Sequence, residues 1–142
     1  MRHVDVFFYG SYINLDVLAE MDLHPSPVQV ATVAGFEIVI APLANLLPAK
    51  GALVWGILAP MTHDELGRLY DEHAQKVLGG TYLPEAVLCL TAAGDYRPAL
   101  TYISPALPSG PVSEAYVERI AGPGEGYGFP DPYLRHLRSF AG

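Results

Sequence analysis

The chain has 142 residues, of which 51% are hydrophobic and 16% are charged, a balance that excludes an intrinsically disordered chain. The length predicts a single domain over residues 1–142. The net charge is −7 with only eight Lys and Arg residues, so no basic face is available for nucleic acid or anionic lipid, which leaves small-molecule chemistry or protein partners.

The first predicted strand covers residues 4–9, VDVFFY, and places Val4, Val6 and Phe8 on one face. Gly10 and Ser11 break this strand. A Gly-Ser turn between a strand and a helix leaves backbone amides free to face an anion or a developing oxyanion, and an ordinary tight turn is the alternative interpretation.

Asn14 is the expected N-cap of a short helix over residues 15–21, which the prolines of LHPSP end. Residues 28–41 then predict a strand or a bent pair of strands, with Gly35 as the bulge or bend. We expect a loop over residues 42–51, PLANLLPAKG, because it holds two prolines and a glycine. The apolar run at residues 52–58, ALVWGIL, predicts a buried central strand.

The clearest helix start in the chain is at Thr62, where Thr62 and Glu65 fit a capping box. Further strands are predicted over residues 86–91 and 98–103. Ser113 is the expected cap of a helix to about Ile120, residues 122–130 are expected to be irregular, and Asp131 starts a last helix through Phe140. Five or six short strands that do not alternate regularly with helices indicate an α+β fold around a small, partly closed sheet.

Cys89 is the single cysteine and lies in the apolar run AVLCL, which excludes an internal disulfide and favours a buried core position. No apolar run reaches the ~20 residues of a membrane span, and Asp5 interrupts any signal-like N-terminal segment, so we expect a cytoplasmic protein. HExxH, GxGxxG and P-loop patterns are absent from the sequence, so neither a metal nor another cofactor is predicted.

Four stretches together resemble the gamma-glutamylcyclotransferase-like family. Tyr9-Gly10-Ser11 resembles its Tyr-Gly-Ser-Asn loop, and residues 54–72, VWGILAPMTHDELGRLYDE, are similar to its central strand and to the helix that ends in Leu-Asp-x-x-Glu. The stretch from Tyr82, Tyr-Leu-Pro-Glu-Ala-Val, resembles the tyrosine-led strand that follows. In the C-terminal part, matching positions are Tyr116, Ile120, Gly128-Phe129-Pro130 and Tyr133.

The resemblance implies a small mixed β-barrel with a few surrounding helices and a cavity at one end. It also implies a reaction in which the α-amine of a gamma-glutamyl group attacks its own γ-carbonyl, releasing 5-oxoproline and an amine. In the family a glutamate at the end of the helix motif transfers the proton. The loop that corresponds to Tyr9, Gly10, Ser11 and Tyr12 holds the substrate, and Tyr116 resembles a pocket tyrosine near the substrate carboxylate.

The sequence departs from the family pattern where the proton carrier is expected. Counted without gaps from Leu69, Tyr70 stands where the family has aspartate and His73 where it has the catalytic glutamate. Three interpretations stay open. Glu72 is the displaced acid/base, or His73 replaces it because imidazole titrates near neutrality, or residues 71–73 are a solvated helix end and the chemistry is lost.

Tyr12 is a second departure, since the family has asparagine there and a phenol offers one hydroxyl on a bulky ring. The first hypothesis is therefore an enzyme of the gamma-glutamyl cyclotransferase type, a transferase without cofactor that acts on a small gamma-glutamyl substrate. The alternative is a non-catalytic small-molecule-binding module of the same fold that has lost the catalytic glutamate. Fold resemblance carries much of either hypothesis.

Overall fold

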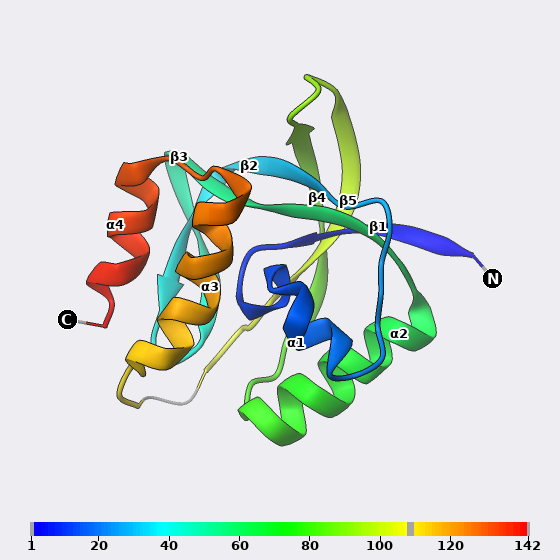
Figure 1. Ribbon diagram of the computed structural model, residues 1–142, viewed down its shortest axis with the longest axis horizontal. Helices are drawn as coiled ribbons and strands as arrows, with labels where there is room; N and C mark the ends of the chain where they lie inside the picture. The colour runs from blue at the N-terminus through cyan, green and yellow to red at the C-terminus, as the bar shows by residue number, and fades with distance from the viewer. Residues whose placement is uncertain (1, 108–109, 142) are drawn as a thin grey trace.

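The computed structural model describes residues 2–107 and 110–141 (Figure 1). Its elements follow one another in the order β1 (His3–Phe8), η1 (Ser11–Ile13), α1 (Leu15–Ala19), β2 (Gln29–Ile40), β3 (Ala44–Thr62), α2 (His63–Gly67), η2 (Arg68–Leu78), β4 (Leu83–Thr91), β5 (Tyr96–Ile103), α3 (Glu114–Tyr127) and α4 (Asp131–Ser139). Within these residues, no helix combines the length and the apolar character that a membrane crossing requires.

The strands close into a ring in the order β1-β3-β2-β4-β5. The long strand β3 pairs antiparallel with β2 along its first part and with β1 along its last part. The ring closes where β2 pairs with β4, and where β1 pairs with β5 in parallel at Val6 and Leu100. The predicted α+β fold around a small sheet is confirmed, and the sheet, expected to be partly closed, forms a complete ring.

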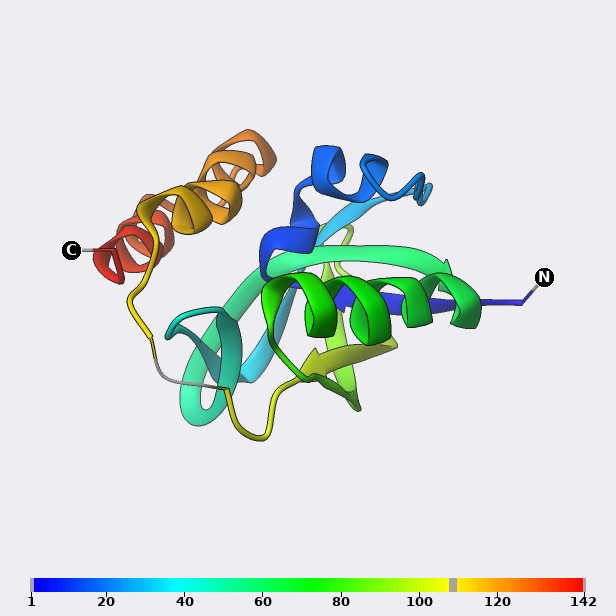
Figure 2. The same cartoon turned by 90° about the horizontal axis from the view of Figure 1, so that it is seen from below.

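The helices pack on different parts of this sheet (Figures 1 and 2). In both views α3 and α4 lie side by side at one end, while η2 continues α2 along another face. Arg138 of α4 bridges Glu118 and Glu125 of α3 at 2.9 and 2.6 Å, which ties the two C-terminal helices together.

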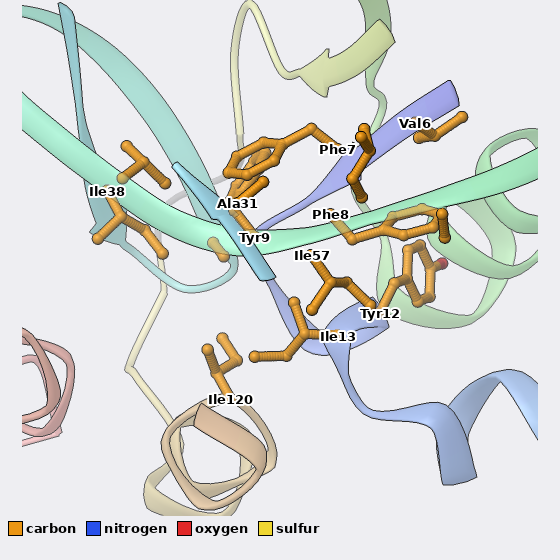
Figure 3. Close-up of a cluster of buried hydrophobic side chains, with 14 of the residues drawn as sticks. Val6, Phe7, Phe8, Tyr9, Tyr12, Ile13, Ala31, Ile38, Ile57 and Ile120 are labelled. Carbon is orange, nitrogen blue, oxygen red and sulfur yellow. The ribbon is translucent and has the colours of Figure 1, made fainter. Parts of the chain in front are cut away.

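The core begins at β1, where Phe7 and Phe8 point to opposite faces and are both at most 1% exposed. Both faces of β1 are therefore covered, which makes the strand a fixed base for the turn that follows it. Figure 3 shows Ile120 of α3 pointing towards Ile13 of η1 beneath this strand. Cys89 is fully buried as predicted, and burial raises the pKa of its thiol to about 11.

The predicted local signals are confirmed in the structure. Asn14 accepts a hydrogen bond from the Asp16 amide at 3.0 Å, Thr62 and Glu65 form both halves of a capping box, and Ser113 caps α3. Gly35 has φ +88°, and the β2–β3 register shifts at this residue as expected of a bulge.

The prediction of a loop over residues 42–51 is wrong, because β3 already starts at Ala44. Residues 44–48 pair with residues 36–40 of β2 after a tight turn. Pairing across the sheet outweighs the prolines, and Gly51 at φ +80° lets the strand continue past the position where a loop was expected.

The expected end of the penultimate helix at Ile120 is also wrong, since α3 runs on to Tyr127 with Pro123 inside it. Proline removes one amide donor from the helix, and packing against α4 keeps the remaining turns in place. Gly124 is part of that packing, because a Cβ there would lie 2.7 Å from the ring of Phe129. No side chain larger than hydrogen fits without displacing the ring.

Candidate functional site

The candidate site starts where β1 ends. After Tyr9 the chain passes through Gly10 into η1, in which Ile13 N–H donates to the Gly10 carbonyl at 3.1 Å. Among the described residues, the amides of Gly10, Ser11 and Tyr12 donate to no other group of the protein. The predicted turn therefore presents free donors, which is the arrangement that suits a carboxylate or carbonyl oxygen.

Gly10 is favoured here by limited space and not by its backbone angle, since its φ is −103°. A Cβ at Gly10 would lie 3.1 Å from Cβ of Ala44 and 3.9 Å from the hydroxyl of Tyr116. Ala44 is held in turn by two tyrosines. Its N–H donates to Tyr116 Oη at 3.0 Å, and its carbonyl accepts from Tyr82 Oη at 2.6 Å.

These groups open on one cavity, which we call the tyrosine pocket. It is lined by Phe8, Tyr9, Gly10, Ser11, Tyr12, Ala44, Tyr70, Ala74, Leu78, Tyr82, Tyr102 and Tyr116. The cavity volume is about 30 Å³, which is room for two or three water molecules. A larger group enters only when the walls move apart.

No lining residue in the described part of the chain carries a formal charge. Burial raises the pKa of Tyr9, Tyr12 and Tyr82, so these phenols stay neutral. Burial also raises the pKa of Tyr116, while hydrogen bonds with the Ala44 amide and the Ser11 side chain oppose that rise. The pocket is a neutral aromatic environment.

His73 stands behind Tyr12, outside the lining of the pocket. Its Nδ1 lies 2.8 Å from Tyr12 Oη, and the same hydroxyl oxygen lies 3.0 Å from the Leu69 carbonyl oxygen. A phenol has one proton, so it donates either to Leu69, with Nδ1–H donating to the phenol, or to a bare Nδ1. Burial lowers the pKa of His73 and Arg119 lowers it further, whereas Glu20 raises it.

Glu72 is exposed and lines a shallow surface depression that His73 and Lys76 also line, and it is absent from the lining of the tyrosine pocket. Its placement follows from the helix, since η2 is wound as a π-helix and residues four apart share a face. Tyr70, Ala74 and Leu78 face the pocket, and Glu72 falls between them on the solvent side.

The five predicted binding residues, Tyr9, Gly10, Ser11, Tyr12 and Tyr116, come together around this pocket. Sequence reasoning missed Tyr70, Tyr82 and Tyr102 as lining residues, although Tyr82 had been noted as the start of a strand. Tyr70 comes from η2, Tyr82 from the segment before β4 and Tyr102 from β5, and no local sequence pattern links them. Their ring contacts, such as Tyr70 stacked on Tyr102 at 3.7 Å, exist only in the folded chain.

Comparison with solved structures places this architecture in a known class. A structure named "Gamma-glutamyl cyclotransferase" matches at TM-score 0.76 with 20% identity, covering 97% of this chain and 88% of that one. The human uncharacterized protein loc79017 matches at TM-score 0.79 with 20% identity, covering 98% and 88%. The yeast gamma-glutamyl cyclotransferase specific to glutathione matches at 0.68 with 12% identity, covering 99% and 96%.

The chain therefore has the gamma-glutamyl cyclotransferase fold over nearly its whole length. No protein-family model and no curated protein sequence matches it.

Proposed function

We propose that this protein binds a gamma-glutamyl compound at the tyrosine pocket and cyclises it, releasing 5-oxoproline and an amine. The observation that carries the proposal is the set of unpaired amide donors at Gly10–Tyr12, three residues that line the tyrosine pocket, together with the contact of Tyr12 with His73. The fold adds support, since a structure named gamma-glutamyl cyclotransferase shares it over most of both chains.

The proposed reaction moves protons from the attacking nitrogen to the leaving nitrogen. The α-ammonium first loses a proton, and the resulting amine attacks the γ-carbonyl carbon. The attacking nitrogen then loses a second proton, the leaving nitrogen takes up one, and the bond from the carbon to the leaving nitrogen breaks. The free amides of the turn stabilise the oxyanion that develops on the γ-carbonyl oxygen.

His73 is the proposed proton carrier, acting through the hydroxyl of Tyr12. The phenol passes its proton to Nδ1 of His73 as it takes one from the substrate, and the reverse transfer serves the leaving amine. The lowered pKa of His73 keeps the imidazole neutral at pH 7 and able to accept the proton. Exposed Glu72 has no such connection to the pocket, which supports His73 over Glu72 in this role.

The test is 5-oxoproline release from a panel of gamma-glutamyl amino acids and amines. His73→Ala is expected to lower kcat by about 10²- to 10⁴-fold, the usual contribution of a positioned acid/base. Glu72→Gln is the matched control one residue away, and it is expected to retain the wild-type rate because Glu72 is exposed. Loss of release in Glu72→Gln with retention in His73→Ala would reverse the assignment.

A second candidate function is a non-catalytic binding module, favoured by the absence of a carboxylate among the described residues that line the pocket. It predicts that gamma-glutamyl compounds or 5-oxoproline raise the melting temperature of the protein without turnover. Release of 5-oxoproline by the wild-type protein excludes this candidate.

A further inference from the structure

The tyrosine pocket has a wall whose phenol protons are already committed. Tyr9 donates to the Tyr102 carbonyl at 2.6 Å, Tyr82 to the Ala44 carbonyl at 2.6 Å, and Tyr12 reaches the Leu69 carbonyl at 3.0 Å. A hydroxyl that has donated its proton can only accept from a ligand. In the resting protein the oxygens of Tyr9 and Tyr82 therefore offer lone pairs to a ligand and no donor.

The rings of the same wall favour positive charge. The faces of an aromatic ring carry negative potential, and a cation against them is attracted most strongly where water is excluded. Six tyrosines and Phe8 line the cavity, and several of their rings contact one another, with Tyr70 lying 5.5 Å from Tyr12 and 6.0 Å from Tyr82 between centroids. Phenols that donate to carbonyls have more electron-rich rings, which strengthens the attraction.

The turn that lines the same pocket has the reverse character. The free amides of Gly10, Ser11 and Tyr12 are donors. Tyr116 accepts from the Ala44 amide, so its own proton is available to Ser11 or to a ligand. The backbone of the turn thus supplies donors, and the tyrosine side chains supply acceptor oxygens and aromatic rings.

We propose that the tyrosine wall of Tyr9, Tyr12, Tyr70, Tyr82 and Tyr102 binds an ammonium group of the ligand through its ring faces and hydroxyl oxygens, in place of a carboxylate. The ligand class is a small compound that carries an ammonium and an acceptor group a few bonds apart. As a statement about the substrate's α-ammonium, the inference rests on the proposed function.

The size of the cavity agrees with this occupant. A volume of about 30 Å³ admits a cationic head of a few atoms and leaves the remainder of a substrate outside. Tyr82 and Tyr102 are the half-buried members of the wall, so a larger head group reaches the pocket past their rings.

The test titrates the protein with methylammonium and choline, each beside a neutral partner of similar shape, methanol and 3,3-dimethylbutan-1-ol. Isothermal calorimetry at constant ionic strength, with potassium chloride as the blank, measures binding. The expected result is saturable binding of at least one cation and at least fivefold weaker binding of its neutral partner. Equal binding of cation and neutral partner, or binding of neither cation, overturns the inference.

Paired variants identify the wall. Tyr82→Leu removes a ring and is expected to weaken cation binding by about 5- to 30-fold, whereas Tyr82→Phe keeps the ring and stays within about twofold of wild type for choline, which has no N–H. If Tyr82→Leu does not fold, Tyr102→Leu and Tyr102→Phe give the same comparison. Equal loss in the Leu and Phe variants contradicts a role for the rings.

Failure of this inference and failure of the proposed function give different results. Cation binding without 5-oxoproline release supports the ammonium site and contradicts the proposed reaction. Release of 5-oxoproline by a protein that discriminates neither choline nor methylammonium from its neutral partner keeps the reaction and removes the tyrosine wall as its ammonium site.

Discussion

Removal of the Tyr12 hydroxyl tests the contact on which the proposed proton transfer depends. Tyr12 is 6% exposed, and its hydroxyl has two partners, the Leu69 carbonyl at 3.0 Å and His73 Nδ1 at 2.8 Å. A hydrogen bond inside a protein contributes about 1 kcal/mol net to stability. Tyr12→Phe loses both contacts, so we expect the free energy of unfolding to fall by about 2 kcal/mol.

His73→Ala removes only one of these contacts and is expected to cost about 1 kcal/mol. In the double variant the hydrogen bond between Tyr12 and His73, which each single variant removes, is lost only once. The expected loss is therefore about 2 kcal/mol and not the additive 3, which corresponds to a coupling energy of about 1 kcal/mol between Tyr12 and His73.

Urea unfolding followed by far-UV circular dichroism and by the fluorescence of Trp55, the single tryptophan, measures all four proteins. Thermal unfolding of Tyr12→Phe should show a Tm lower by about 4–8 °C. Additive losses in the double variant would mean that the two side chains do not interact. That result would also contradict the proposed proton transfer from the pocket to His73.

Two further predictions concern stability. Burial lowers the pKa of His73 in the folded protein, so the imidazole binds a proton more readily in the unfolded chain. The free energy of unfolding is therefore highest above pH ~6.5, and it falls as the pH drops below that value towards the lower pKa of the folded state. Urea midpoints at pH 8 and pH 5 should differ less in His73→Ala than in wild type, and an unchanged difference contradicts the assignment. In α3, Gly124→Ala should destabilise by about 1–2 kcal/mol, since its Cβ would meet the Phe129 ring at 2.7 Å. A Cβ at Gly126 has no atom within 4 Å, so Gly126→Ala should stabilise the protein by about 0.5 kcal/mol. Equal shifts of the melting temperature in the two variants would refute the packing argument.

Much of the fold could be predicted from the sequence because its signals are local. The Thr62–Glu65 capping box, the Asn14 and Ser113 caps and the Gly35 bulge each depend on residues within a few positions of one another. Such patterns determine backbone conformation wherever the chain folds. The two errors, at residues 42–51 and after Ile120, arose where pairing with the neighbouring strand or packing against the next helix outweighed proline and glycine.

The candidate site divides in the same way. The sequence by itself determined the turn at Gly10 and Ser11, because a strand followed by a glycine and a short helix leaves amides without partners whatever surrounds them. Only the tertiary structure decided that His73 meets Tyr12 while Glu72 stays exposed, because Tyr12 comes from a segment about sixty residues earlier in the chain. The tyrosine pocket likewise needs the closed ring of strands, since its walls come from segments up to about a hundred residues apart that only this closure brings together.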